Sequence, residues 1–170
     1  MNAVDVAGAA DEMTQLTAYL QRQRAELRRR ASGLDADQWQ QTLPGSASPM
    51  TLAGMVAHLA FVEDYWCVER VAGDPAPEPW ASAPWEQDWD WEWHQAASWE
   101  QQQVWDLYEA AVGRADAALA GRGAAELAAT TLLDGAPMNL RWVLLHLIEE
   151  YARHLGHADL IREALDGQTG

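Results

Sequence analysis

The stretch that decides the fold is residues 140–165, LRWVLLHLIEEYARHLGHADLIREAL. Its apolar residues recur at the spacing of an amphipathic helix, and they are Leu144, Leu147, Ile148, Tyr151, Leu155 and Ala158. At about 100° per residue, Glu150, His154 and His157 all project within roughly 80° of the direction of His146. One narrow stripe of the helix therefore carries four groups that bind metals or transfer protons. Buried groups of this kind need a partner, and the rest of the chain can be searched for it.

Helical spacing of apolar residues recurs in three further segments, residues 9–32, 51–72 and 98–119. Ser98 and Gln101 form a capping-box pattern at the start of the third of these, and Asn139 is placed to cap the last helix. The intervening connections show no convincing strand pattern. We therefore expect an all-α fold, a four-helix bundle formed by a single domain over residues 1–170.

Residues 73–97 form a long Trp-rich loop between the second and third predicted helices. Seven of the ten tryptophans lie between Trp80 and Trp105, and prolines exclude a helix from the first half of the loop. Trp89, Trp91 and Trp93 alternate with acidic residues, which predicts an extended segment with one buried face. The tryptophans either cover the bundle or form an aromatic lid over a site, and the sequence leaves both interpretations open.

Composition excludes several classes of protein. The net charge of −15, from 11 basic and 26 acidic residues, argues against nucleic acid and against anionic membrane surfaces. Apolar runs are shorter than the roughly 20 residues of a spanning helix, and residues 1–13 lack the features of a signal peptide. The single cysteine, Cys67, excludes an internal disulfide and is expected to be a buried structural thiol. We expect a cytoplasmic protein.

A transition-metal site on helices needs two ligands one turn apart and at least one from another helix. Glu150 and His154 have that spacing, and His58 is the histidine that another predicted helix offers. Two imidazoles and a carboxylate suit Zn²⁺, Ni²⁺ or Fe²⁺ and leave positions for water or substrate. The alternative is that each histidine, including His94 in the Trp-rich loop, only forms hydrogen bonds in the core or at the surface.

Four other residues are candidates for positions around such a site. His146 and His157 face the same region and serve either as alternative ligands or as hydrogen-bonding neighbours. Tyr65 lies two turns after His58 in the same direction. Arg153 projects beside the stripe and either meets a substrate carboxylate or is an ordinary surface arginine.

Two sequence motifs, one in the second predicted helix and one in the last, are similar to those of a known family. A histidine stands early in the second helix, in TLAGMVAHLAFVEDYW, and the last helix reads H-x-x-x-E-x-x-x-H-x-G-H from His146. The chain resembles, over nearly its whole length, the DinB/YfiT-like superfamily of bacterial four-helix-bundle metalloproteins, and an actinobacterial DinB-like branch in particular. The superfamily usually holds its metal with three histidines, and the resemblance places the ligands at His58, Glu150 and His154. Glutamate at position 150 departs from most members but matches the related mycothiol-dependent maleylpyruvate isomerase.

The resemblance implies a metal-dependent enzyme that transfers a low-molecular-weight thiol such as mycothiol or bacillithiol to an electrophile, or that uses the thiol in an isomerisation. A divalent cation lowers the pKa of a thiol and so supports a nucleophile at neutral pH. Two other functions use the same residues: a non-catalytic metal-binding or stress-response bundle, and a metal-dependent hydrolase. The sequence leaves the metal, the thiol, the electrophile and the formation of a homodimer undecided.

Overall fold

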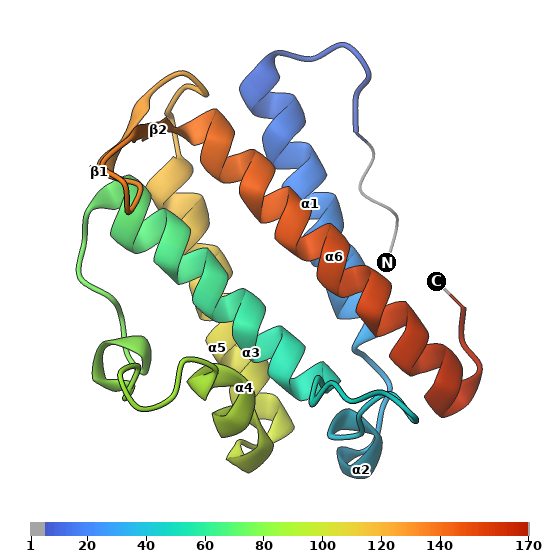
Figure 1. Ribbon diagram of the computed structural model, residues 1–170. Helices are drawn as coiled ribbons and strands as arrows, with labels where there is room; N and C mark the ends of the chain where they lie inside the picture. Colours follow the sequence, from blue (N-terminus) through green and yellow to red (C-terminus); the bar gives the residue numbers. More distant parts are fainter. Residues whose placement is uncertain (1–5, 170) are drawn as a thin grey trace.

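Four long helical segments account for most of the protein (Figure 1). The computed structural model describes residues 6–169, and 62% of the chain is helical. The long segments are α1 (Glu12–Arg30), α3 (Leu52–Glu63) with its continuation η1 (Asp64–Ala72), α5 (Gln101–Leu119) and α6 (Leu140–Asp166). Helix α1 packs mainly against α6, and α3 packs mainly against α5. The prediction of a mainly helical protein is confirmed.

The ends of these helices follow from local chemistry. The carboxylate of Asp11 caps α1, the hydroxyl of Thr51 caps α3, and the amide oxygen of Asn139 caps α6 at 3.0 Å from the backbone N–H of Trp142. Gly167 ends α6 with a φ of 75°, a left-handed conformation that favours glycine. The predicted capping box at Ser98 is wrong, because α5 begins at Gln101 after Glu100 and the Ser98 hydroxyl instead donates to the carbonyl of Gln95.

The continuation of α3 has a different helical geometry from the one predicted. Residues Asp64–Ala72 form the π-helix η1, in which each turn holds more residues than in an α-helix, so the side chains after Asp64 are turned relative to the expected face. Gly73 ends this segment with a φ of 76°. The long helix over residues 51–72 is therefore present, but only its first half has α-helical register.

A small sheet corrects the expectation of a fold without strands. Strands β1 (Leu127–Thr131) and β2 (Pro137–Asn139) pair antiparallel, and Gly135, with a φ of 83°, lies in the turn between them. Strand β1 also lies against η1, where the hydroxyl of Thr130 donates to the carbonyl of Arg70 at 3.3 Å. Strands this short carry little pattern of their own, because their pairing depends on partners distant in sequence.

The Trp-rich loop contains three short helical turns, η2 (Trp80–Ser82), α4 (Trp91–Gln95) and η3 (Ala96–Ser98). The predicted extended segment at residues 89–93 is wrong, because the carbonyl of Asp90 accepts bonds from the backbone N–H groups of Trp93 and His94 and closes a helical turn. The rings of Trp80, Trp85, Trp91 and Trp99 contact one another. Most of the loop therefore covers the bundle.

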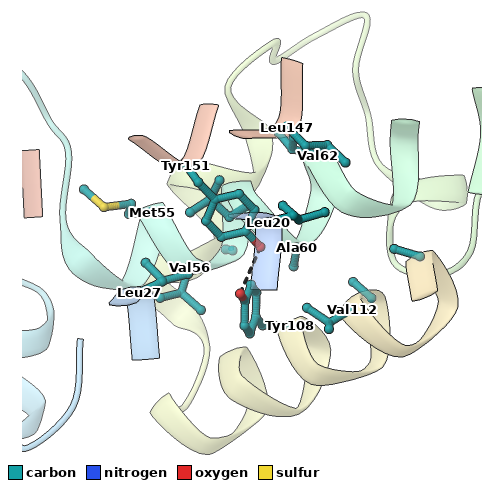
Figure 2. Packing of buried hydrophobic residues seen from close by; sticks show 14 of the residues in the cluster. Leu20, Leu27, Met55, Val56, Ala60, Val62, Tyr108, Val112, Leu147 and Tyr151 are labelled. Atoms are coloured by element: carbon teal, nitrogen blue, oxygen red, sulfur yellow. Dashed lines mark hydrogen bonds between the residues drawn. The ribbon is translucent and has the colours of Figure 1, made fainter. Parts of the chain in front are cut away.

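The apolar core lies between the four long segments (Figure 2). Leu20 and Leu27 from α1 meet Val56 from α3, Val112 from α5 and Leu147 from α6, so each long helix buries one stripe. Cys67 is buried as expected, and burial raises the pKa of its thiol. Within residues 6–169, no helix combines the length and apolar character needed to cross a membrane.

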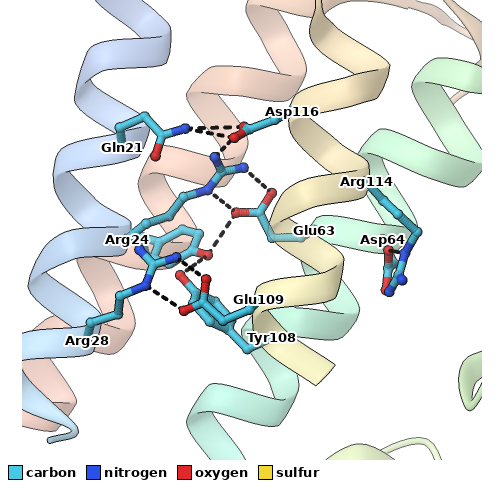
Figure 3. A network of polar contacts seen from close by, with 10 residues as sticks. Gln21, Arg24, Arg28, Glu63, Asp64, Tyr108, Glu109, Arg114 and Asp116 are labelled. Atoms are coloured by element: carbon cyan, nitrogen blue, oxygen red, sulfur yellow. Dashed lines mark hydrogen bonds and ion pairs between the residues drawn. The ribbon is translucent and has the colours of Figure 1, made fainter. Parts of the chain in front are cut away.

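A charged network crosses the same core (Figure 3). The guanidinium of Arg24 donates two bonds to the carboxylate of Glu63, at 2.7 and 2.6 Å, and a third to Asp116 at 2.6 Å. The hydroxyl of Tyr151 donates to Glu63 at 2.8 Å and lies 2.9 Å from the hydroxyl of Tyr108. Buried charges are tolerated here because they are paired and hydrogen-bonded.

Candidate metal centre

His58, Glu150 and His154 converge from α3 and α6. One ligand atom from each lies within 4.8 Å of the other two. Nε2 of His154 is 3.5 Å from Oε2 of Glu150, and Nε2 of His58 is 3.9 Å from the same oxygen. Three residues that the sequence grouped from two different helices are therefore brought together at one point.

The two helices place these side chains in different ways. On α6, residues 150 and 154 are four apart, so their side chains lie one turn apart on the same face. On α3, His58 lies at the edge of the buried stripe and 19% of its side chain is exposed, against 12% for Glu150 and 8% for His154. The centre is thus largely shielded, with its most accessible side at His58.

Glu92 and Trp93 complete the centre, and sequence reasoning missed Glu92. Oε1 of Glu92 lies 2.8 Å from Nδ1 of His58, and this bond directs the other ring nitrogen toward Glu150. The indole of Trp93 stacks on His58 with ring centroids 4.8 Å apart, and its centroid is 5.6 Å from that of His154. Trp93 therefore lies over two of the candidate ligands, where the lid interpretation places it. The one available signal was an acidic residue between two tryptophans, which does not indicate a buried carboxylate.

Close approach of α4 to α3 depends on Gly54, one turn before His58. A Cβ atom on residue 54 would lie 2.6 Å from Cε3 of Trp93, which is closer than real side chains approach. The absence of a side chain at Gly54 is therefore what admits the indole of Trp93 over the histidine.

Charges in the centre favour a carboxylate anion beside a neutral imidazole. The adjacent imidazole of His58, with help from Arg153, lowers the pKa of Glu150 to about 2 despite partial burial. Burial lowers the pKa of His154 to about 4, so its ring is neutral at pH 7. Burial also acts to lower the pKa of His58, but the carboxylates of Glu150 and Glu92 outweigh it and raise that pKa above its ordinary value.

The donor set fits a divalent transition metal. Ligands held about 2.1 Å from a tetrahedral metal lie about 3.4 Å apart. The two distances to Glu150 are 3.5 and 3.9 Å, and all three ligand atoms lie within 4.8 Å of one another, so a small inward movement would bring them to that spacing. Several buried atoms of the cluster also lack a hydrogen-bond partner within residues 6–169, namely Oε2 of Glu92, Nδ1 of His154 and Nδ1 of His157. A cluster with converging lone pairs and unpaired polar atoms is incomplete as a purely structural network.

The sequence matches the family model described as mycothiol-S-transferase over residues 15–167. The chain belongs to this family. The match spans α3, the Trp-rich loop and α6, and it confirms the resemblance to the DinB/YfiT-like superfamily. A search of curated proteins found no match.

Two of the predicted neighbours of the metal lie beside the three candidate ligands of this family member. Nε2 of His146 is 4.0 Å from Oε1 of Glu150, and its ring stacks on Trp142 with centroids 5.2 Å apart. The ring of His157 contacts that of His154, with centroids 5.7 Å apart.

The remaining candidates are placed differently. Arg153 donates to Glu150 at 3.1 Å and to Glu149 at 2.7 Å, so its guanidinium is already engaged by carboxylates. Tyr65 contacts Phe61 and Trp66, and its hydroxyl accepts a bond from Arg70. Within residues 6–169 no ring contact joins Tyr65 to either candidate histidine ligand. His94 is exposed and pairs with Asp88 at 2.8 Å, as a surface histidine does.

Proposed function

We propose that this protein is a divalent-metal-dependent thiol S-transferase with its metal held by His58, Glu150 and His154. The observation that carries the proposal is the convergence of one ligand atom from each residue within 4.8 Å, in a chain that matches the mycothiol-S-transferase family model. In this proposal the fold is the four-helix bundle of the DinB/YfiT-like superfamily, and the protein acts in the cytoplasm.

The proposed ion is Zn²⁺, with Ni²⁺ and Fe²⁺ as alternatives that the same donors accept. A bound divalent cation supplies a positive charge that lowers the pKa of a thiol, so that mycothiol or a similar small thiol becomes a nucleophile at neutral pH. Glu150 adds one negative charge to the ligand set. That charge reduces the net positive charge of the loaded site relative to a set of three histidines, and so favours a more reactive sulfur.

The protein's own residues hold the ligands in position. His58 donates its Nδ1 proton to Glu92, which leaves the lone pair of Nε2 directed toward Glu150. His154 is neutral at pH 7 because its pKa is about 4, so its Nε2 is free to act as a donor atom. Arg153 bonds Oε1 of Glu150, and Oε2 of the same carboxylate faces both histidines.

Trp93 has a separate role. Its indole lies flat on the ring of His58 and contacts His154, so it excludes water from one side of the centre. A lower local dielectric strengthens the electrostatic effect of a cation on a nearby thiol.

Metal loading followed by a thiol titration tests the proposal. Elemental analysis after loading with Zn²⁺ or Ni²⁺ is expected to give about one ion per chain, in keeping with a three-ligand site. Mycothiol is expected to raise the melting temperature of the loaded protein and to leave the chelator-treated protein unchanged. Mass spectrometry is expected to detect a thioether when an electrophile such as a haloarene is added.

Two outcomes would contradict the proposal in different ways. Absence of metal after loading would remove the site assignment itself. Stoichiometric metal without any effect of mycothiol would leave a metal-binding bundle and remove the transferase.

A further inference from the structure

A hollow separate from the candidate metal centre lies between the helical segment α3–η1 and the Trp-rich loop. Its volume is about 500 Å³, within the range of small-molecule sites. Five aromatic side chains line it together with one carboxylate, and they are Phe61, Tyr65, Trp80, Trp85, Trp89 and Glu69. We call these six residues the aromatic cage. None of them is a candidate ligand of the metal centre.

Hydrogen bonds fix two walls of the aromatic cage. The indole N–H of Trp80 donates to the buried carboxylate of Asp64 at 2.8 Å, and that carboxylate is itself held by two bonds from Arg114. The indole N–H of Trp85 donates to the carbonyl of Trp80 at 3.0 Å. Both rings are therefore oriented without any ligand present. Trp80 is buried at the base of the hollow, with 1% of its surface exposed, whereas Trp85 is only partly buried.

The remaining rings complete the enclosure. The ring of Phe61 lies 4.8 Å from that of Trp85 and 5.4 Å from that of Trp80, measured between centroids. At the rim, Trp89 is 82% exposed, so its ring is accessible to a molecule that enters the hollow.

Charge in the aromatic cage is negative. Glu69 is the charged residue among those that line it. Its side chain is half-buried, and its carboxylate has no hydrogen bond or ion pair with another residue from 6 to 169. Arg70 does not line this hollow, because its guanidinium lies over the ring of Tyr65 and lines the neighbouring hollow. Burial raises the pKa of Glu69, and the charge of Arg70 acts in the opposite direction.

We propose that the aromatic cage is a binding site for a small organic cation, specifically a methylated ammonium ion that carries an apolar or aromatic group. Aromatic faces attract cations through their quadrupole, and several rings around one carboxylate form the arrangement that selects quaternary ammonium ligands. The net charge of −15 further raises the local concentration of cations.

The degree of methylation follows from the acceptors present. A primary ammonium ion has three donors to satisfy, whereas the cage offers the carboxylate of Glu69 as its charged acceptor. Unpaired N–H groups in a partly buried site are costly, so an ion with few or no N–H groups is favoured. The volume exceeds that of a trimethylammonium group and leaves room for an attached apolar group beside Trp89.

Choline is a suitable probe, with 3,3-dimethylbutan-1-ol as its uncharged isostere and ethanolamine as its primary-ammonium counterpart. Binding to chelator-treated protein is followed by the upfield shift of the ligand's methyl proton signal that aromatic ring currents produce, or for ethanolamine by calorimetry. Choline is expected to bind at least about tenfold more tightly than either comparison compound. Because the protein is metal-free, the result is independent of the proposed transferase activity.

Two variants assign the binding to the aromatic cage. Glu69→Gln is expected to weaken choline binding about tenfold and to leave binding of the neutral isostere unchanged. Its matched control is Glu163→Gln, an equal charge change at an exposed position of α6, with no expected effect. Trp89→Ala removes an exposed ring, so the fold is retained, and is expected to weaken choline binding about threefold.

Three outcomes would overturn the proposal. Choline that shows no shift means that the cage takes no such cation. Equal binding of choline and its neutral isostere means that the hollow is only apolar. A preference for choline that survives Glu69→Gln means that the cation binds elsewhere on an acidic surface.

Discussion

Two polar clusters lie inside this helical protein, and they differ in how completely their atoms are paired. Around Arg24, the two carboxylate oxygens of Glu63, the hydroxyl of Tyr151 and the carboxylate of Asp116 all have partners within 2.9 Å. Around His154, the nearest carboxylate oxygen is 3.5 Å away, and its Nδ1 has no hydrogen-bond partner among residues 6–169.

This difference indicates that the cluster around Arg24 is structural, whereas the cluster around His154 can bind a ligand. Arg24 and Glu63 pair with each other through two hydrogen bonds, and with Tyr151 they connect α1, α3 and α6. The histidine cluster has three converging donors at distances too long for hydrogen bonds but suited to a small cation between them. Pairing, rather than the mere presence of charge in the core, is what distinguishes the two roles.

Removal of one partner from the cluster around Arg24 is expected to have the largest effect, a loss of folding stability. Glu63→Gln leaves the buried guanidinium of Arg24 without its main counter-charge, and should lower the free energy of unfolding by about 3 to 5 kcal/mol. Urea denaturation measures the change. Glu109→Gln is the control, because it breaks the exposed pair with Arg28 and should cost less than about 1 kcal/mol. Equal effects of the two variants would show that burial of the pair does not matter.

Loss of a candidate ligand from the cluster around His154 is expected to weaken metal binding and to leave the fold intact. His154→Ala should weaken Zn²⁺ binding more than about 100-fold, because loss of a direct ligand costs more than loss of an outer partner. Competition with a chromophoric chelator measures the affinity. His94→Ala, which removes an exposed histidine paired with Asp88, is the matched control. Unchanged affinity in His154→Ala would refute the assignment of this residue.

An outer partner of the same cluster should have a smaller effect. In Glu92→Gln an amide replaces the carboxylate that accepts from Nδ1 of His58, so the preferred ring tautomer is no longer enforced. Metal affinity is expected to fall about tenfold. Nitrogen chemical shifts of His58 report the tautomer directly. Glu86→Gln, an exposed position in the same loop, should change neither quantity, and an unaffected tautomer in Glu92→Gln would exclude this positioning role.

The acid stability of the metal-free protein should also depend on His154. His154 has a folded-state pKa of about 4 against an ordinary value of 6.5, so between these pH values the unfolded chain binds a proton that the folded chain does not. Stability contributed by neutral His154 should therefore be lost as pH falls from about 6.5 toward about 4, by about 2 to 3 kcal/mol.

His154→Gln provides the comparison for this pH dependence. The variant has no titrating group at this position, so its free energy of unfolding should fall less between pH 6.5 and pH 4.5 than that of the wild type. Both proteins retain Glu150, whose pKa of about 2 means that its own contribution is lost only below its ordinary pKa of 4.5 and so outside this window. Parallel pH profiles would contradict the lowered pKa of His154.

Much of the candidate centre could be predicted from sequence. Glu150 and His154 are one turn apart in a strongly periodic helix, and helical geometry alone places such residues on one face. Asn139 and Gly167 mark the ends of that helix through local capping chemistry. His58 could be inferred because it is the histidine that a second amphipathic helix offers.

Other parts of the structure depend on contacts between segments distant in sequence. Glu92 becomes a partner of His58 only because α4 folds over α3, and Gly54 allows it by leaving space for Trp93. The π-helical geometry of η1 and the pairing of β1 with β2 also depend on tertiary contacts, since β1 lies against both η1 and β2. Short elements without strong periodicity gain their conformation from such neighbours.

The sequence by itself determined the long helices, the stripe on α6 and the three candidate ligands, because periodicity and capping act over a few residues. Only the tertiary structure decided which carboxylates are paired and which are not. Glu63 and Glu150 both lie on helices that face the core, yet one meets Arg24 and the other meets two histidines. That choice is fixed by how four helices pack, because hydrogen bonding acts across space rather than along the chain.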